Sequence, residues 1–370
     1  MIGEDKRCKL TTIDELILQQ QPFAVYRTPG SEKFRLLRQE HGSIRQLKDL
    51  KELNGERGFV IAPFRVSEQH PIVLLQPDED IDFCTFDADE PLEAGTQSLS
   101  DEQMETLSTE GYGVCFRTFL EALQNKTFEK LVLSRSITEE RMEGFSPAAA
   151  FRAACSRYVH SYVYLCYTPQ TGVWLGSTPE IILSGRQGEW NTVALAGTQS
   201  LQNGELPQVW DEKNREEQAY VTAYIRRQLH SLGIEAHEKG PYPAYAGALS
   251  HLKTDFRFSL SDPDNLGDLL EVLHPTPAVC GLPKEEAYRF ILDHEGYDRK
   301  YYSGFIGWLD PDGQTDLYVN LRCMNVEADR LVLYAGGGLL ASSEVNDEWM
   351  ETEKKLQTMK RLIRSTPTLS

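Results

Sequence analysis

Residues 161–199, SYVYLCYTPQTGVWLGSTPEIILSGRQGEWNTVALAGTQ, contain three apolar, β-branched and aromatic runs divided by Gly, Pro and Asn. Runs bounded in this way predict β-strands joined by short turns. A long helix is expected next, at 211–231, and a hairpin at 317–338 with its turn near Glu327–Arg330. The strands of a parallel sheet usually alternate with helices, and few of these strands do so. The sequence therefore predicts an α+β fold with large antiparallel or mixed sheets.

The rest of the chain adds elements of both kinds. Strands are predicted at 59–66, 70–78 and 131–140, and helices at 112–125 and 146–158, the second of which begins with Ser-Pro. Residues 85–107 are acidic and rich in turn-forming residues, so this segment is predicted to be a loop or linker.

Composition excludes several classes of protein. The 370 residues include 56 acidic and 38 basic side chains, which give a net charge of −18, and such a surface repels nucleic acid and anionic membranes. The sequence contains no run of 18 apolar residues, so no membrane span is expected. The N-terminus lacks the apolar core of a signal peptide. Seven cysteines without a CxxC motif are expected to be reduced thiols of a cytoplasmic protein.

The segment AGGGLLASSEVNDEWMETEKKL, which starts at Ala335, carries acidic residues that could hold a metal ion. Glu348, Glu351 and Lys355 are spaced i, i+3 and i+7, so a helix places them on one face. Two stacked carboxylates after a glycine-rich turn suit a divalent cation that also contacts an anionic ligand. The alternative is a solvated acidic face.

A third carboxylate, Glu217, lies in DEKNREEQAY on the predicted helix 211–231, on a face that also carries Lys213, Asn214 and Tyr220. With Glu351 it could complete an oxygen-ligated Mg²⁺ site, while no His/Cys cluster suggests zinc. A charged helix surface is the alternative.

Two residues could exchange protons with a substrate. Lys130 precedes the apolar run of LVLSR, and a lysine at a buried strand edge can lose its proton and act as a general base. Glu180 lies between a Gly-Ser-Thr-Pro turn and an apolar run, where a carboxyl tends to keep its proton and can act as a general acid. The alternatives are a surface lysine and an exposed glutamate at a strand start.

Other residues could bind an anionic ligand. Arg322 is flanked by apolar strand residues, so its guanidinium is expected either to clamp a carboxylate or to form an internal salt bridge. The turns at 196–198 and 336–338 could offer backbone N–H groups to a ligand, although neither matches a nucleotide-binding motif. His251 and His274, taken singly, are typical of structural histidines.

Together these segments resemble the chorismate-utilising enzyme family. The motifs follow the family's order over about residues 110–365: FEKLVLSRS, LGSTPEIIL, ALAGTQS, DEKNREEQAY, SHLKTDF, HPTPAVCG, DRKYYSGFIGW, VNLRC and AGGGLLASS…DEWMETEKK. The resemblance implies two packed αβ lobes with large antiparallel sheets and an active site in the cleft between them. Residues 108–370 are expected to form the chorismate-binding catalytic region, and residues 1–107 a variable part of the same fold.

Three positions distinguish the activities within this family. Lys130 resembles members that use water as the nucleophile, and Ala196 stands where aminodeoxychorismate synthases tend to carry a nucleophilic lysine. Ala278 resembles isochorismate synthases, since salicylate synthases tend to have a hydroxyl residue there. The resemblance therefore implies an isomerase that converts chorismate to isochorismate, with salicylate synthase, an ammonia-using synthase and a binding-only relative as the alternatives.

The resemblance also implies a role for each site residue. Mg²⁺ is expected on Glu217 and Glu351, with Glu348 helping through water; Lys130 is the expected base and Glu180 the acid. The substrate-binding residues implied are Gly197, Thr198, His251, Ala278, Tyr302, Arg322, Gly336, Gly338 and Lys355. A monomer without a glutamine amidotransferase subunit is expected, in menaquinone biosynthesis or, alternatively, in a siderophore or salicylate pathway.

Overall fold

A computed structural model of the chain describes residues 6–78, 82–86, 109–186, 188–246, 249–260 and 262–364. In this part of the chain, ten strands form one sheet, which we call sheet A. Every neighbouring pair is antiparallel except β1 and β7. Its strands, in spatial order, are β1 (Lys6–Cys8), β7 (Asp82–Phe86), β3 (Phe34–Arg38), β2 (Phe23–Arg27), β9 (Tyr162–Thr168), β10 (Gly172–Thr178), β18 (Cys323–Val326), β19 (Arg330–Leu339), β8 (Lys130–Glu140) and β15 (Gly281–Leu282).

The other nine strands in the described residues form sheet B, in which every neighbouring pair is antiparallel. They are, in spatial order, β13 (Ala236–Ala246), β14 (Leu249–Ser259), β12 (Glu189–Ser200), β11 (Ile181–Arg186), β17 (Gln314–Val319), β16 (Phe305–Leu309), β5 (Gly58–Ala62), β6 (Ile72–Leu75) and β4 (Arg45–Leu47).

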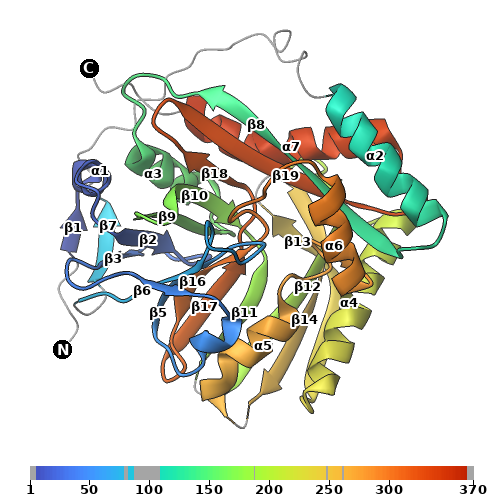
Figure 1. Ribbon diagram of the computed structural model, residues 1–370, viewed down its shortest axis with the longest axis horizontal. Helices are drawn as coiled ribbons and strands as arrows, with labels where there is room; N and C mark the ends of the chain where they lie inside the picture. The colour runs from blue at the N-terminus through green and yellow to red at the C-terminus, as the bar shows by residue number, and fades with distance from the viewer. Residues whose placement is uncertain are drawn as a thin grey trace.

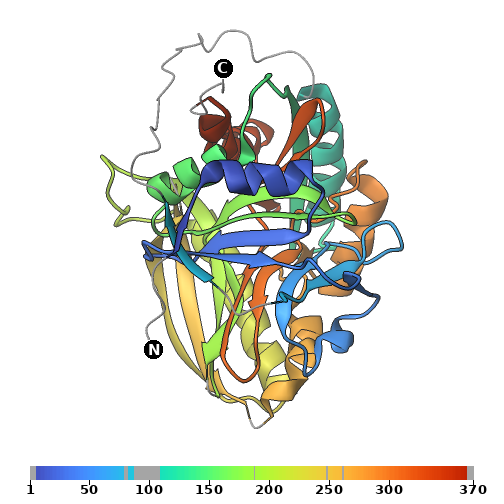
Figure 2. The ribbon, with the colours of Figure 1, turned by 90° about the vertical axis from the view of Figure 1, so that its left-hand side faces the viewer.

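The helices cover the outer faces of the two sheets. Against sheet A lie α1 (Leu10–Leu18), α3 (Pro147–Arg157) and α7 (Val345–Arg364). Against sheet B lie α4 (Glu212–Ser231), α5 (Leu266–Leu273) and the short helix η1 (Leu50–Leu53), with η3 (Pro263–Asn265) leading into α5. The helices α2 (Thr109–Gln124) and α6 (Lys284–His294) pack beside β8 and β15 at the edge of sheet A. Figure 1 shows α3 and α7 on one side of the molecule and α4 and α5 on the other, and Figure 2 gives the perpendicular view.

Alternation along the strands produces this layered arrangement, because successive side chains of a strand point to opposite faces. In β9, Tyr162 and Tyr164 pack between the two sheets, whereas Val163 and Leu165 pack under the helices. The layer between the sheets is rich in aromatic rings, and Tyr162 stacks there on Tyr318 of sheet B with ring centroids 4.4 Å apart.

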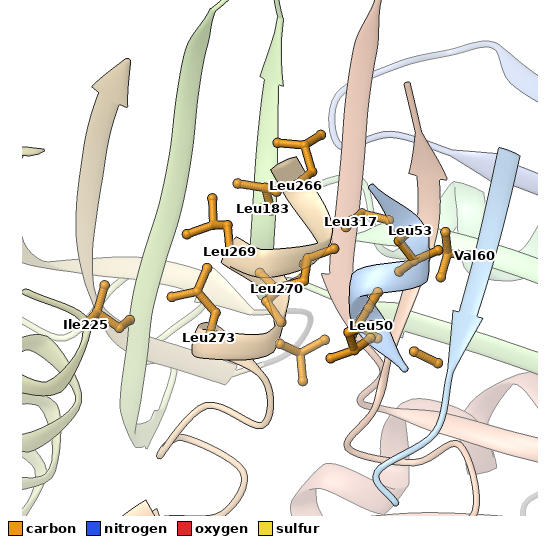
Figure 3. Packing of buried hydrophobic residues seen from close by; sticks show 14 of the residues in the cluster. Leu50, Leu53, Val60, Leu183, Ile225, Leu266, Leu269, Leu270, Leu273 and Leu317 are labelled. Carbon is orange, nitrogen blue, oxygen red and sulfur yellow. The ribbon is translucent and has the colours of Figure 1, made fainter. Parts of the chain in front are cut away.

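The outer layer over sheet B shows how a short helix is held in place. The apolar residues of α5 recur at Leu266, Leu269, Leu270 and Leu273, which is the spacing of one helix face. Figure 3 shows these side chains meeting Leu50 and other apolar residues of η1 and sheet B. This packing fixes the end of α5, from which the chain continues toward the site described below.

The structure confirms the predicted α+β class with two large antiparallel sheets, and it corrects the bounds of several elements. The strands predicted at 59–66 and 70–78 are shorter, and β5 ends before Pro63, which cannot donate to a ladder. The predicted loop at 85–107 lies outside the described residues except for Thr85 and Phe86, which end β7.

A larger correction concerns the hairpin predicted at 317–338. Its turn at 327–329 is found, between β18 and β19, but residues 317–319 belong to β17 in the other sheet. Arg322 is therefore not inside a strand: it ends the crossing from sheet B to sheet A and has a φ of 48°. Asn320 stabilises this crossing, since its amide donates to Tyr301 O and accepts a hydrogen bond from the Tyr164 hydroxyl.

Candidate active site

A pocket lies where the two sheets and the helices α4 and α7 meet. Strands β8 and β19 of sheet A form one wall, and β12 and β14 of sheet B, with Pro179 and Glu180 just before β11, form another. Eleven residues predicted for the site line this pocket: Glu180, Gly197, Thr198, Glu217, His251, Ala278, Tyr302, Arg322, Gly336, Gly338 and Lys355. The structure thus gathers residues from eight separate sequence motifs into one place.

The other three predicted residues, Lys130, Glu348 and Glu351, do not line the pocket but contact residues that do. Lys130 lies against Glu217, Glu351 accepts from Lys355, and Glu348 lies beside Gly337.

Lys130 is completely buried at the first position of β8, so the alternative of a surface lysine is wrong. Its Nζ lies 2.9 Å from Glu217 Oε1. The angles of this contact are poor for a hydrogen bond, and Nζ makes none with the described residues. A buried amine without a hydrogen-bond partner is one that a substrate or water can engage.

Glu180 is also buried, with 3% of its surface exposed, so it is not an exposed glutamate at a strand start. Burial raises the pKa of Glu180 to about 7, although Lys130 and a hydrogen bond from Thr276 act in the opposite direction. The carboxyl therefore holds its proton in part of the molecules at neutral pH, as a general acid must.

Each of the three predicted metal ligands faces a lysine. Glu217 lies against Lys130, Glu351 accepts from Lys355 at 2.7 Å, and Glu348 forms an ion pair with Lys213. In the described residues, no group of three or more His, Cys, Asp or Glu side chains is positioned to hold a metal ion. The charge of this acidic region is thus balanced by lysines rather than exposed to solvent.

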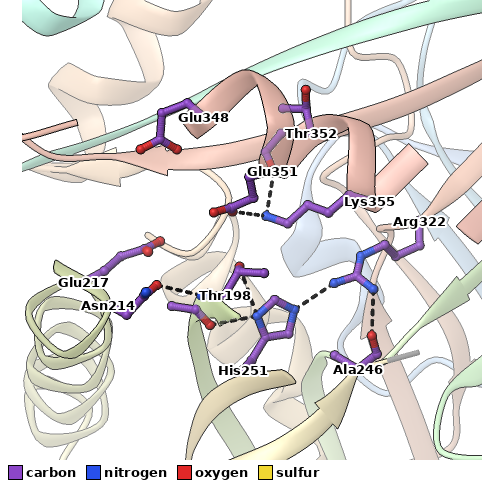
Figure 4. A network of polar contacts seen from close by, with 12 residues as sticks. Thr198, Asn214, Glu217, Ala246, His251, Arg322, Glu348, Glu351, Thr352 and Lys355 are labelled. Carbon is purple, nitrogen blue, oxygen red and sulfur yellow. Dashed lines mark hydrogen bonds and ion pairs between the residues drawn. The ribbon is translucent and has the colours of Figure 1, made fainter. Parts of the chain in front are cut away.

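These carboxylates nevertheless converge on one stretch of backbone. A Cβ added at Gly337 would lie 3.2 Å from Glu348 Oε2 and 3.5 Å from Glu351 Oε1, and one added at Gly338 would collide with Glu217 Oε1. Figure 4 shows Glu217, Glu348 and Glu351 facing a common space between α4 and α7. Glu348 Oε2 is buried without a hydrogen-bond partner in the described part of the chain. This donor set of carboxylate oxygens fits a hard divalent cation.

The electrostatics of the two α7 carboxylates differ. Burial raises the pKa of Glu348, with Glu351 adding to the effect and Lys213 opposing it. Burial also acts on Glu351, but Lys355 and Lys213 outweigh it and hold the pKa of Glu351 below its usual value. Glu351 is therefore the carboxylate of the two that is charged more readily.

The turn at 196–198 is a β-bulge at which the register of β12 against β14 shifts. Gly197 has a φ of +73°, and an added Cβ would lie 2.7 Å from Asn214 O, so only glycine fits there. The Thr198 N–H donates to Asn214 Oδ1 at 2.7 Å. This N–H is therefore occupied, and Thr198 can offer a ligand its hydroxyl but not the backbone donor that was predicted.

His251 and Arg322 form one hydrogen-bonded unit in the pocket (Figure 4). His251 Nδ1 lies 2.8 Å from Gly197 O and 3.2 Å from the Thr198 hydroxyl, and its Nε2 lies 2.7 Å from Arg322 Nη2. Burial, together with the charges of Arg322 and Lys355, lowers the pKa of His251 to about 3. The imidazole is neutral at physiological pH.

Arg322 is buried and has no carboxylate within ion-pair distance among the described residues. Its guanidinium donates to Ala246 O at 2.9 Å and to Nε2 of the neutral His251. Of the two expectations for Arg322, the internal salt bridge is therefore not found. An uncompensated guanidinium in a pocket wall is suited to bind a ligand carboxylate.

Aromatic and small residues complete the pocket. Tyr302 stacks on Tyr334 with ring centroids 5.4 Å apart. An added Cβ at Gly336 would lie 2.9 Å from the Tyr302 hydroxyl, so glycine lets that hydroxyl approach the strand. Lys355 donates to Gly336 O at 2.8 Å and joins α7 to β19. His274 lies away from the pocket and binds Pro63 O through Nε2, as expected for a structural histidine.

Sequence reasoning missed two contacts of the site. Thr276 donates to Glu180 Oε1 at 3.4 Å. The only sign of this in the sequence is that Thr276 lies in HPTPA, two residues before Ala278. Lys213 was placed on the face of Glu217, but its pairing with Glu348 required the position of α7.

Comparisons with known proteins follow this geometry. The sequence profile of the chorismate binding enzyme family matches residues 60–364, and the chain belongs to this family. Isochorismate synthase EntC of Escherichia coli is 30% identical over 239 residues, which are 62% of this chain and 61% of that protein. The match thus spans less than two thirds of this curated relative.

Solved structures show the same fold. The menaquinone-specific isochorismate synthase MenF of Escherichia coli superposes with a TM-score of 0.77 at 22% identity, covering 95% of this chain and 91% of that chain. Anthranilate synthase component I of Streptococcus pneumoniae superposes with a TM-score of 0.64 at 18% identity, over 95% and 85% of the two chains. Among the described helices, none has the length and apolarity needed to cross a membrane.

Proposed function

We propose that the protein is an isochorismate synthase, which isomerises chorismate to isochorismate by adding water at C2 and releasing the C4 hydroxyl. The observation that carries this proposal is a pair of buried titratable groups: Glu180, which lines the pocket, and Lys130, which lies against the lining residue Glu217. Lys130 is contributed by sheet A, and Glu180 precedes the first strand residue of β11 in sheet B. Family membership supports the substrate, since this is a family of chorismate binding enzymes.

In this proposal the two groups serve the two ends of one displacement. Lys130, in its neutral form, takes a proton from water while the water oxygen forms a bond to C2. The ring double bond shifts, the C4–O bond breaks, and Glu180 gives its proton to the departing hydroxyl, which leaves as water. Each proton transfer of this kind contributes ~10²–10⁴ in rate. The raised pKa of Glu180, about 7 because of burial, supports its role as the acid.

The remaining pocket residues hold the substrate. Arg322, which has no carboxylate partner in the described residues, would bind the enolpyruvyl carboxylate together with Tyr302. Gly197 and Thr198 would position the ring carboxylate or the water, helped by the neutral His251. Lys355 would balance the charge of the acidic groups beside it, and Gly336 and Gly338 leave room for the ligand next to β19.

The proposal includes a Mg²⁺ ion held by Glu217 and Glu351, with Glu348 assisting. The convergence of these carboxylates at Gly337 and Gly338 and the unpartnered Glu348 Oε2 support it. When bound, the ion would neutralise the ring carboxylate and withdraw electron density from the ring. Binding would require the carboxylates to exchange contacts with Lys130, Lys213 and Lys355 for contacts with the ion.

The alternative activity is salicylate synthase, in which pyruvate elimination follows isochorismate formation. Ala278 lines the pocket without a hydroxyl and supports the isochorismate product. Ala196, also in the pocket wall, offers no nucleophile, and water rather than ammonia is the proposed reactant.

Product analysis tests the proposal. The protein is incubated with chorismate and Mg²⁺, with an EDTA control, and the products are separated by chromatography with mass detection. We expect an isomer of unchanged mass that is lost with EDTA. Salicylate plus pyruvate would move the assignment to salicylate synthase, and an ammonium-dependent product to an ammonia-using synthase. No turnover would contradict the proposal.

We further propose a monomer that works in the cytoplasm. Cys155, Cys166 and Cys280 are free thiols, which supports a reducing compartment. Menaquinone biosynthesis stays the predicted use of the product, with siderophore biosynthesis as the alternative.

A further inference from the structure

Thr276 lies against the carboxyl group of Glu180. Its hydroxyl donates to Glu180 Oε1 at 3.4 Å, and both side chains are buried. In the described residues no other side chain hydrogen-bonds this carboxyl, and Oε2 accepts no hydrogen bond. The two oxygens of Glu180 are therefore not equivalent.

The loop that carries Thr276 is held at both ends by cations, of which Lys284 is half-buried and Arg299 is buried. Before Thr276, Lys284 donates to three backbone carbonyl groups, those of Glu271, Val272 and His274. After it, Arg299 donates to Val279 O at 2.7 Å. These contacts fix the position of the backbone on either side of Thr276.

Contacts within the same loop and to the neighbouring segment add to this. Thr276 O accepts from the backbone N–H groups of Val279 and Cys280, each at 3.0 Å. His274 Nε2 lies 3.1 Å from Pro63 O. Because the loop cannot easily shift, the Thr276 hydroxyl is presented to Glu180 in one place.

This geometry determines which oxygen of Glu180 exchanges the proton. A threonine hydroxyl that donates to Oε1 makes Oε1 an acceptor, and this favours Oε2 as the oxygen that carries the proton of the neutral carboxyl. We propose that Thr276 is a positioning residue that directs the acidic proton of Glu180 onto Oε2 and toward the substrate. This inference rests on the proposed function, in which Glu180 is the general acid.

Thr276 also affects how readily Glu180 loses that proton. A donated hydrogen bond stabilises the charged carboxylate. The positive charges that act on Glu180 come from Lys130 on β8, Lys355 on α7 and Arg322 at the crossing between the sheets. These charges and the Thr276 hydroxyl all lower the pKa of Glu180, whereas burial raises it. Removal of the hydroxyl should therefore raise the pKa of Glu180.

The test compares Thr276→Val, which keeps the shape but removes the donor, with Thr276→Ser, which keeps the donor. Glu180 is titrated by carbon-13 NMR of its carboxyl, identified by its absence in Glu180→Gln, and kcat is measured against pH. For the valine variant we expect kcat to fall by roughly twofold to tenfold, the worth of one hydrogen bond. We also expect its Glu180 titration, and the alkaline limb of kcat, to move to higher pH. The serine variant should stay close to wild type.

Two results would overturn the inference: an unchanged titration and kcat in Thr276→Val, or an equal loss of kcat in both variants without movement of the titration. Thr276→Ala supplies a second hydroxyl-free variant if valine disturbs folding. If the wild-type protein does not convert chorismate but the Glu180 titration still moves in the valine variant, the contact stands and the proposed function fails.

Discussion

Arg322 Nη2 lies 2.7 Å from His251 Nε2, and this contact fixes the state of the histidine ring. A guanidinium can only donate, so Nε2 must accept, and the ring proton of the neutral imidazole sits on Nδ1. Nδ1 in turn lies 2.8 Å from Gly197 O, which can only accept. The neutral His251 thereby orients one nitrogen of Arg322 without neutralising the charge of the guanidinium. The guanidinium keeps its full attraction for a ligand carboxylate.

Replacement of Arg322 by Gln should weaken chorismate binding more than it slows chemistry. Hydrogen bonds to charged groups are worth about 1.5–3 kcal/mol, so KM should rise by roughly tenfold to hundredfold. The matched control is Arg257→Gln, which changes an exposed arginine on β14 away from the pocket. Steady-state kinetics on both variants provide the measurement, and an unchanged KM in Arg322→Gln would rule out the carboxylate clamp.

Replacement of Lys130 by Gln should remove turnover but keep the binding of chorismate in the presence of Mg²⁺. The amide has no basicity, and loss of one proton transfer costs ~10²–10⁴ in rate. Product formation and equilibrium binding are measured on the same preparation. Lys126→Gln, at an exposed position before β8, serves as the control and should be active. Near-normal turnover in Lys130→Gln would show that the base has been assigned to the wrong residue.

Lys213 should compete with the metal ion for Glu348. Because the ammonium pairs with this carboxylate, binding of a dication must displace it. Lys213→Met should therefore tighten Mg²⁺ binding by roughly twofold to fivefold, the range for a partly exposed ion pair. Calorimetric titration with Mg²⁺ in the Lys130→Gln background, with chorismate present, avoids turnover. Lys213→Arg keeps the charge and is the control. Weaker Mg²⁺ binding by the methionine variant would instead show that Lys213 holds Glu348 in position for the ion.

Replacement of Gly338 by Ala should disturb Lys130 and Glu217 together. The added Cβ would collide with Glu217 Oε1 and approach Lys130 Cε to 3.0 Å. A displacement of about 1 Å at reacting groups costs roughly 10² in rate, and overpacking lowers the unfolding free energy by about 1–3 kcal/mol. Product assays and denaturant unfolding measure the two effects. Gly111→Ala, in α2, where an added Cβ meets no atom within 4 Å, should keep full activity and should not lower the unfolding free energy. Full activity of Gly338→Ala would contradict the packing described.

Local sequence patterns were sufficient for the strongest elements of the fold. Ser146 before Pro147 marked the start of α3, because this signal acts within one helical turn. Arg322 shows where local patterns fail. Apolar neighbours on both sides suggested a strand, but the chain leaves sheet B at 319 and enters sheet A at 323. Strand pairing between distant segments decides this, and no local pattern records it.

The candidate site could also be predicted only in part: its residues follow from local motifs, but the contacts between them do not. The motifs identified which residues belong to it, since family resemblance preserves their order along the chain. Their partners depend on contacts across 135 positions for Lys213 and Glu348, and across 96 for Thr276 and Glu180. The ion pairs that occupy the predicted metal ligands could therefore not be foreseen, nor could the use of the Thr198 N–H by Asn214.

The pairing of β8 with β19 has a consequence for how the protein is made. Lys130, at the start of β8, is synthesised long before Gly336 and Gly338, which pair opposite Ser134 and Val132. Until the ribosome has released the last strand, the growing chain has an unpaired strand edge, the kind of edge that other chains can join. The pocket gains Lys355 only with the final helix. A prematurely terminated product that lacks this helix could fold most of both sheets and still have no complete ligand site.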